Sequence, residues 1–257
     1  MIYNLYKQRG ETPLECIQRF AKATPELKRQ KMTYLGRLDP LAEGVLLMAS
    51  GEDVKRKEEF LKLDKEYDFV ALFGFATDTY DILGKIMRVE KLSELSENEV
   101  RKVAMIYEGE REQKYPEYSS KVISFRKSFS SESPRISLLR SARLSSENSF
   151  SKKITIYKLQ FHKLDTLNSK ELFGRLLMDI SKVKGDFRQT QILSLWKEML
   201  LGSKRSYFLG HFSASVSSGT YIRDLVNNIG KTLGCGATTL SIKRNKVGNY
   251  KIKDSMK

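Results

Sequence analysis

The feature that most constrains this 257-residue chain is a short turn that leads directly into an apolar run. Asp39 stands before a proline, which pushes it out of the helical region into an extended or turn conformation. Gly36 and Gly44 permit tight backbone on either side, and Val45–Met48 has the composition of a buried strand. A carboxylate on a stiff turn that enters the core is well placed for chemistry. Asp-Pro also starts ordinary turns, and on local grounds alone that interpretation is favoured.

The balance of charge indicates the kind of partner. Lys and Arg total 46 against 31 Asp and Glu, which gives a net charge of +15 and a pI of about 9.6. A chain this basic is expected to bind polyanions, because each phosphate contact releases counterions. A proteome that is basic throughout would give the same balance. No apolar run reaches the length of a membrane span, and the N-terminus lacks the apolar stretch of a signal peptide. We therefore expect a cytoplasmic protein with no membrane partner.

The residue types that usually hold metals or cofactors are few and scattered. Cys16 and Cys235 lie far apart in the sequence, and the two histidines are His162 and His211. Together they show no spacing typical of a structural zinc site. Neither a Walker-type phosphate loop nor a Gly-x-Gly-x-x-Gly element occurs. We expect no metal, no nucleotide cofactor and no other cofactor.

Hydrophobic periodicity predicts helices and strands throughout the chain. Thr12 and Glu15 have the form of a capping box, so a helix should run from Pro13 to about Lys22. The other predicted elements are strands at 68–74, 154–161 and 212–216, an exposed helix within 52–68 and an amphipathic helix at 93–107. Asp78 and Asp81 are expected to be turn formers that accept from nearby backbone N–H groups.

Two helical patterns stand between the strands predicted at 154–161 and 212–216. Glu171–Val183 and Phe187–Leu201 carry apolar residues at helical spacing, and Gly185 with its following aspartate separates them. We expect a helical insertion over residues 166–206, packed on the main body. It could be a surface for a partner or a simple elaboration of the fold.

Residues 121–153 differ in composition from the rest of the chain. Serine is abundant, and eight Lys or Arg face only Glu132 and Glu147. Such a stretch buries little apolar surface and suits a flexible loop that grips phosphates and orders on binding. A solvated linker with no function is the alternative.

The turn around Asp39 also carries a resemblance to a known family. Residues 34–47 read Tyr-Leu-Gly-Arg-Leu-Asp-Pro-Leu-Ala-Glu-Gly-Val-Leu-Leu, which resembles the catalytic motif of the TruB family of RNA pseudouridine synthases. Tyr34 stands where the family has histidine. A second match is Ser-Gly-Thr-Tyr-Ile-Arg at 218–223, followed by Leu-Gly-Cys-Gly-Ala at 233–237. The resemblance covers about 1–125 and 151–250, without the helical insertion.

The resemblance implies roles for individual residues. Asp39 would be the catalytic nucleophile, and Arg223 would pair with it, which keeps the carboxylate ionised and fixes its rotamer. Tyr67 would stack on the target base and help move the proton. Lys7 either belongs to the family's first turn or is a solvated surface lysine. The residues expected to contact RNA are Tyr34, Arg37, Lys65, Tyr118, Lys121, Arg126, Arg135, Arg140, Arg143 and Arg244.

The same resemblance implies an α+β pseudouridine synthase fold, a mixed and mostly antiparallel central sheet flanked by helices. Residues 1–257 would form a single catalytic domain, since ten residues after Val247 cannot make the small C-terminal RNA-binding domain of many members. We expect a monomer that isomerises a uridine in the T-loop of tRNA, with the tRNA T-arm as its partner. The alternatives are a related enzyme for ribosomal or messenger RNA, and a non-catalytic RNA-binding protein that acts as a tRNA-folding chaperone.

Overall fold

The structure is a computed structural model that describes residues 1–114 and 151–257 of the chain. Within them the strands are β1 (Ile2–Lys7), β2 (Met32–Tyr34), β3 (Ala42–Ser50), β4 (Lys65–Phe73), β5 (Phe75–Thr77), β6 (Ile86–Val89), β7 (Gly109–Lys114), β8 (Ser151–Asn168), β9 (Ser206–Val216), β10 (Ala237–Val247) and β11 (Tyr250–Lys251). The α-helices are α1 (Pro13–Ala23), α2 (Lys57–Leu61), α3 (Glu97–Ile106), α5 (Ser169–Ser181), α6 (Gln189–Leu201) and α7 (Ile222–Thr232). The predicted elements are thus present, and the fold is α+β.

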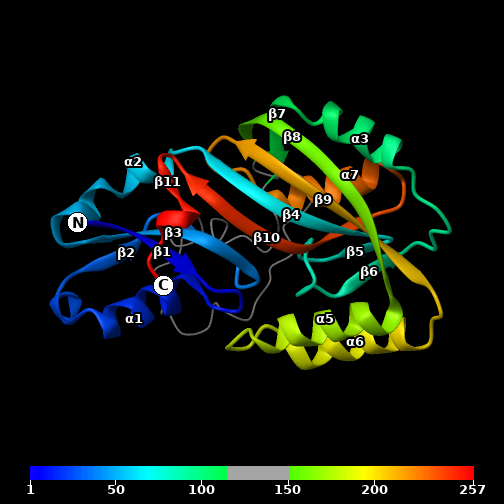
Figure 1. The fold of residues 1–257 in the computed structure, drawn as a ribbon, viewed down its shortest axis with the longest axis horizontal. Coiled ribbons are helices and arrows are strands. Elements are labelled where there is room, and N and C mark those ends of the chain that lie inside the picture. Colours follow the sequence, from blue (N-terminus) through cyan, green and yellow to red (C-terminus); the bar gives the residue numbers. More distant parts are fainter. Residues whose placement is uncertain (115–150) are drawn as a thin grey trace, which may run out of the picture.

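One large mixed sheet forms the framework (Figure 1). Its strand order is β1-β3-β10-β4-β9-β8-β7, with β2 added to β3 and β11 added to β10. Among the described strands the pairs are antiparallel except β10 with β3, where Ile242–Arg244 runs parallel to Ala42–Gly44. Gly44 permits this approach, because its φ is 107° and a Cβ atom there would lie 2.3 Å from the Arg244 carbonyl oxygen. Strand β10 therefore fixes the backbone just after the Asp39 turn.

The first helix begins as its sequence predicts. The Thr12 hydroxyl accepts from the Glu15 backbone N–H at 3.2 Å, and the Glu15 carboxylate accepts from the Thr12 N–H at 2.7 Å. This capping box satisfies two of the N–H groups that a helix start leaves unpaired. The apolar stripe of α1 packs Cys16 and Ile17 against Leu46 of β3.

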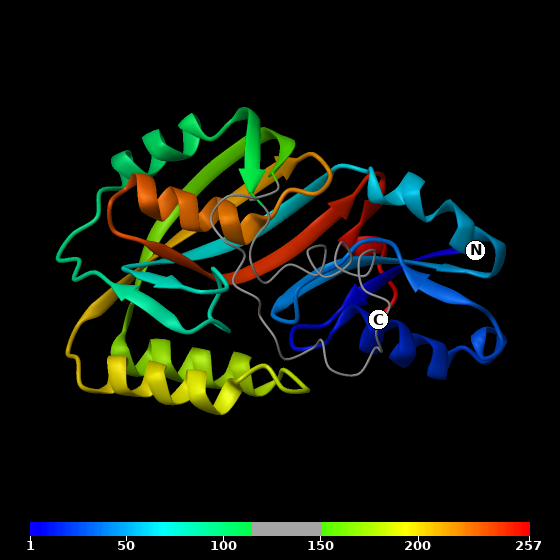
Figure 2. The ribbon, with the colours of Figure 1, turned by 180° about the vertical axis from the view of Figure 1, so that it is seen from behind.

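The two faces of the sheet bury different helices. Tyr67, Phe69 and Ala71 alternate along β4 and face the core beneath α3 and α7, which Figure 2 shows in front of the sheet. Leu72, on the other face of the same strand, packs in the cluster that contains the apolar residues of α5 and α6. This alternation is the period of two that a strand imposes. Helices α7 and α5–α6 therefore meet opposite sides of one strand.

The helical insertion is present, and the strand before it is longer than predicted. β8 continues beyond Phe161 to Asn168 because its second half still pairs with β9, as far as Asn168 opposite Ser206. The Asn168 side chain then caps α5 by accepting from the N–H groups of Lys170 and Glu171, each at 3.0 Å. Helices α5 and α6 lie side by side below the β5–β6 hairpin in both overall views.

The charged segment before β4 is helical in two short pieces. Gly51–Arg56 is a 3₁₀ helix, and α2 follows it directly. Three ion pairs at i,i+3 spacing connect this segment, which fits a 3₁₀ turn because residues three apart eclipse one another. No helix within 1–114 or 151–257 is long and apolar enough to cross a membrane.

Candidate active site

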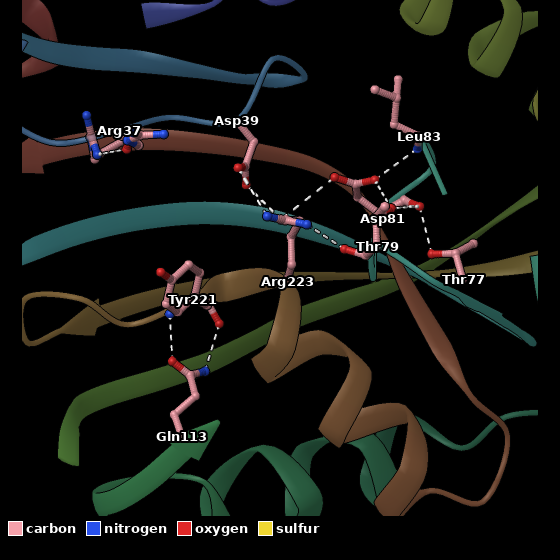
Figure 3. Close-up of polar contacts among 10 residues, drawn as sticks. Arg37, Asp39, Thr77, Thr79, Asp81, Leu83, Gln113, Tyr221 and Arg223 are labelled. Carbon is pink, nitrogen blue, oxygen red and sulfur yellow. Dashed lines mark hydrogen bonds and ion pairs between the residues drawn. The ribbon is translucent and has the colours of Figure 1, made fainter. Parts of the chain in front are cut away.

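Asp39 and Arg223 lie in direct contact, although 184 residues separate them in sequence. The guanidinium binds the carboxylate through two hydrogen bonds, Nε to Oδ2 at 2.7 Å and Nη2 to Oδ1 at 3.2 Å (Figure 3). Asp39 lies on the turn before β3, and Arg223 lies in the first turn of α7. The pairing predicted from the sequence is confirmed.

The two partners differ in their access to solvent. The Arg223 side chain is 7% exposed and the Asp39 side chain 39% exposed. Burial alone would lower the pKa of Arg223, but the charges of Asp39 and Asp81 outweigh it and raise that pKa above its ordinary value. The arginine is therefore a fixed cation, and the bidentate contact orients an aspartate that still reaches the surface.

A second carboxylate also faces Arg223. The Oδ2 atom of Asp81 lies 3.7 Å from the guanidinium Nε, while its Oδ1 atom accepts from the Thr79 hydroxyl at 2.6 Å and from the Leu83 N–H at 2.9 Å. Burial raises the pKa of Asp81, and Arg223 opposes that rise. Asp81 is thus the turn former that the sequence predicts, and it is also a partner of Arg223 that the sequence did not predict.

The loop that carries Asp81 binds Arg223 through its backbone as well. The Thr79 carbonyl oxygen accepts from Arg223 Nη1 at 2.5 Å (Figure 3). Tyr80, between Thr79 and Asp81, has a φ of 63°, a left-handed conformation that is unfavourable for a bulky residue. This backbone outlier places the Thr79 carbonyl and the Asp81 carboxylate toward one guanidinium, and strain of this kind is often found at functional sites.

Two buried cations hold the Asp39 turn from inside the protein. Lys7 is fully buried, and its ammonium donates to the carbonyl oxygens of Pro40 at 3.1 Å and Ala42 at 2.5 Å. Arg244 donates to the carbonyl oxygens of Val45 at 2.7 Å and Arg37 at 2.9 Å. Lys7 is therefore not a solvated surface lysine.

The burial of Arg244 corrects its predicted role. Its relative exposure is 2%, because β10 lies in the sheet interior beside β3 and turns the side chain under the Asp39 turn. A direct contact with RNA, as expected from the sequence, does not fit this position. Lys65 requires the same correction, since it is buried and its ammonium donates to the carbonyl oxygens of Leu61 and Leu63.

Tyr67 lies on β4 opposite Ala214 of β9 and Arg244 of β10. It is buried in the same core cluster as Leu38 and Ala42, which flank the turn of Asp39. Tyr67 therefore lies near the turn that carries Asp39.

Other predicted RNA contacts fall in two groups. Arg37 is exposed, and its guanidinium carbon lies 5.9 Å from the centre of the Tyr34 ring, which Lys57 also approaches at 5.8 Å. A half-buried aromatic flanked by cations suits a nucleic-acid surface. Residues Tyr118, Lys121, Arg126, Arg135, Arg140 and Arg143 lie outside the part of the chain that the structure describes, as does most of the predicted loop at 121–153.

Gln113 fixes the start of the helix that carries Arg223. Its side-chain amide donates to the Tyr221 carbonyl oxygen at 2.9 Å, and its Oε1 atom accepts from the Tyr221 N–H at 2.7 Å (Figure 3). Tyr221 is the N-cap residue of α7. The sequence alone did not predict this role, because the signal for it is the buried position of Gln113 on β7.

In the described ranges, no three His, Cys, Asp or Glu side chains come together in a way that could hold a metal ion. The site is built from a paired carboxylate, a buried guanidinium and backbone carbonyls. Such an arrangement can present an oriented carboxylate to a molecule at the surface.

The mixed α+β fold is that of a pseudouridine synthase. A family model described as "TruB family pseudouridylate synthase (N terminal domain)" matches residues 25–187. Because this match spans more than half of the sequence, the chain belongs to the TruB family.

Curated relatives extend the likeness over nearly the whole chain. A tRNA pseudouridine synthase B of Thermotoga petrophila is 28% identical over 251 residues, which are 98% of this chain and 64% of that protein. One of Endomicrobium trichonymphae is 27% identical over 253 residues, 98% of this chain and 87% of its own length. The chain thus spans less than two thirds of the first relative's length and most of the second's.

Solved structures share the fold at lower identity. A chain in the crystal structure of a Cbf5–Nop10–Gar1 complex has a TM-score of 0.56 and 20% identity, with 97% of this chain and 49% of that chain covered. The H/ACA ribonucleoprotein bound to a substrate RNA containing 2′-deoxyuridine contains another, with a TM-score of 0.54.

Proposed function

We propose that this protein isomerises uridine to pseudouridine within RNA and that Asp39 is its nucleophile. The observation that carries the proposal is the Asp39–Arg223 pair, in which a buried cation orients a carboxylate that remains 39% exposed. Membership of the TruB family supports the reaction class. The net charge of +15 and the exposed Arg37 beside the Asp39 turn support an RNA substrate.

The reaction rearranges one nucleoside without a net change in its atoms. The glycosidic bond from the ribose to N1 of uracil breaks, the base rotates, and a bond forms between the ribose and C5. C5 loses its proton and N1 gains one. Because stacking hides the base, the uridine must first be flipped out of the RNA fold.

Each residue of the site has a part in this proposal. Asp39 forms a covalent bond with either the uracil ring or the ribose, which divides one difficult step into easier ones. Arg223 holds Asp39 in its reactive rotamer through the bidentate contact. Tyr67 packs against the flipped base and assists the proton transfer from C5.

We infer that the natural substrate is tRNA and that the modified uridine lies in its T-loop. The relatives named tRNA pseudouridine synthase B support this choice. Tyr34 and Arg37, next to the reactive turn, offer an aromatic ring and a cation to the RNA that surrounds the flipped base.

The direct test incubates the purified protein with a T-arm stem-loop RNA and measures pseudouridine by nucleoside mass spectrometry. We expect product with the native chain and none with Asp39→Asn. Ribosomal and messenger RNA fragments in parallel reactions test the choice of substrate, and a higher rate on either would replace tRNA. A native protein that binds and refolds tRNA but forms no product would instead be an RNA chaperone.

A further inference from the structure

The helical insertion α5–α6 contacts the loop that binds Arg223 directly and reaches the Asp39 turn through one intervening turn. One contact region includes the turn before α1, which touches the Asp39 turn. The other includes residues 77–84, the loop that binds Arg223. Both overall views place α5 and α6 alongside this loop region and the β5–β6 hairpin (Figures 1 and 2).

On the Asp39 side, the contacts are an ion pair and a close backbone approach. Arg9 pairs with Asp179 of α5 at 2.9 Å, with both side chains about nine-tenths buried, and donates to the Leu240 carbonyl oxygen at 2.6 Å. Gly10 has a φ of 96° and donates from its N–H to the Pro40 carbonyl oxygen at 2.8 Å. A Cβ atom at Gly10 would lie 2.6 Å from the Cβ of Lys182. The residue that ends α5, Lys182, is therefore in close contact with Gly10, which is hydrogen-bonded to the Asp39 turn.

On the Arg223 side, the insertion binds the loop at two points that flank Thr79 and Asp81. Arg188 donates to Asp78 through Nη1 at 2.9 Å, and the same carboxylate accepts from the Lys85 N–H at 2.8 Å. Trp196 donates from its indole N–H to the Ile82 carbonyl oxygen at 3.1 Å. Its ring is fully buried and lies 4.9 Å from the ring of Phe75.

The backbone conformation of Arg188 is a second indication that the contact between the insertion and the 77–84 loop is under strain. It is the N-cap of α6, where Ser, Thr, Asp and Asn are preferred, and its φ of 64° is left-handed. Among the described residues, one other non-glycine residue has a positive φ, and this is Tyr80. Arg188 pairs with Asp78, two residues before Tyr80, so both outliers occur at this one junction.

We propose that the α5–α6 insertion is a clamp that sets the distance between the two loops of the active site, with Arg188 as its principal positioning residue. This inference rests on the proposed function, because it concerns the rate of that reaction. The clamp contacts neither Asp39 nor Arg223 directly. It acts through the Thr79 carbonyl and the Asp81 carboxylate, whose positions orient the guanidinium.

The test compares Arg188→Gln with the native chain for pseudouridine formation in the T-arm RNA. We expect kcat to fall about tenfold, because small displacements of positioning groups cost rate, while KM for RNA changes less than about twofold. Arg188→Lys should recover part of the rate by restoring the charge. Trp196, the single tryptophan of the chain, reports whether the insertion stays docked, and its emission should be unchanged in both variants.

Two further variants test whether the clamp acts through the pair of Arg188 with Asp78. Lys184→Gln removes an exposed cation from the same inter-helix turn and is expected to leave kcat unchanged. Asp78→Asn removes the ion pair from the other side and retains an oxygen for the Lys85 N–H. Its loss of kcat should match that of Arg188→Gln, and the double variant should lose no more than either single variant.

The outcomes distinguish failure of the clamp from failure of the proposed function. A native chain that makes no pseudouridine overturns the proposed function and the clamp with it. A native chain that is active while Arg188→Gln and Asp78→Asn keep full kcat overturns the clamp alone. A rise in KM at unchanged kcat, in both Arg188→Gln and Lys184→Gln, would make the tip of the insertion an RNA contact instead. If Arg188→Gln shifts the Trp196 emission, the insertion has moved in that variant, and the kcat of Asp78→Asn then tests the clamp in its place.

Discussion

The two loops that face Arg223 each present one carboxylate, but they are held in opposite ways. The Asp39 turn is held through its backbone: carbonyl oxygens of the turn and of the start of β3 accept hydrogen bonds from the buried cations Lys7 and Arg244. The Asp81 loop is gripped partly by its carboxylate, which accepts from Thr79 and from a backbone N–H within the same loop. The Asp39 side chain is 39% exposed, whereas that of Asp81 is 13% exposed.

This difference shows how one arginine can serve two carboxylates with separate tasks. A loop held through its backbone leaves the side chain free to meet a substrate. A loop held through its side chain uses that carboxylate for structure and charge. The contrast supports the proposal that Asp39 carries out the reaction and that Asp81 orients Arg223, and each prediction below tests one part of it.

The largest expected effect is that of Asp39→Asn. An amide cannot act as the nucleophile, so pseudouridine formation should fall at least about a thousandfold. RNA affinity should stay within a few-fold, since the side chain remains similar in size. Product formation and a filter-binding Kd measured on the same T-arm RNA check both statements. Retained turnover would remove Asp39 from the role of nucleophile.

Lys7→Met tests the backbone grip on the Asp39 turn. It leaves the Pro40 and Ala42 carbonyl oxygens without their donor, so the free energy of unfolding should fall by about 3 kcal/mol in denaturant titrations. Burial lowers the pKa of Lys7 to about 8. Between about pH 8 and 10 the unfolded lysine then binds more protons than the native one, so native stability rises with pH.

Lys7→Met has no group that titrates at this position, so its stability serves as the reference for the native chain at each pH. The stability gap between native chain and Lys7→Met should therefore widen when the pH is raised from about 7 to about 9.5. A gap that stays constant would show that Lys7 does not titrate in this window. A stability difference that becomes smaller as the pH rises would contradict the lowered pKa of Lys7.

Asp81→Asn tests whether Asp81 orients Arg223 rather than taking part in the reaction. The amide keeps an oxygen for the Leu83 N–H but loses the charge near Arg223, so kcat should fall about tenfold. This loss is much smaller than that of Asp39→Asn because Asp81 bonds to no substrate atom in the proposed reaction. Equal losses from the two substitutions, measured in single-turnover assays, would make the two carboxylates equivalent.

Trp196→Phe should produce the smallest effect. The ring remains buried, but the Ile82 carbonyl oxygen loses its donor, so the free energy of unfolding should fall by about 1 kcal/mol. Met199→Leu, at a partly exposed position on the same helix, serves as a control that should leave stability unchanged. Urea titrations followed by circular dichroism measure both. An unchanged midpoint for Trp196→Phe would show that the indole hydrogen bond contributes nothing to stability.

Local sequence patterns predicted much of the fold because their causes are local. The capping box at Thr12 and the two helical patterns of the insertion depend only on residues within one or two turns. The far end of β8 was missed for the same reason. Beyond Phe161 all of its residues are exposed or half-buried, so the sequence there shows no alternation of buried and exposed positions.

The site was predicted where a motif fixed the partners and missed where burial decided them. The pairing of Asp39 with Arg223 came from two motif matches and is confirmed. Arg244 and Lys65 look like surface cations in sequence, because nothing local shows that their strands lie inside the sheet. The contact of Asp81 with Arg223 depends on a left-handed residue between two turns, which residue types do not reveal.

The place of β10 in the sheet has a consequence for how the protein is made. This strand leaves the ribosome long after β3 and β4, yet in the folded sheet it lies between them. Until β10 is synthesised, β3 and β4 each have an unpaired edge. Such edges slow folding and promote aggregation. A nascent chain that has not reached residue 237 would hold the Asp39 turn through Lys7 but without Arg244, so the proposed nucleophile reaches its final position only after β10 has been translated.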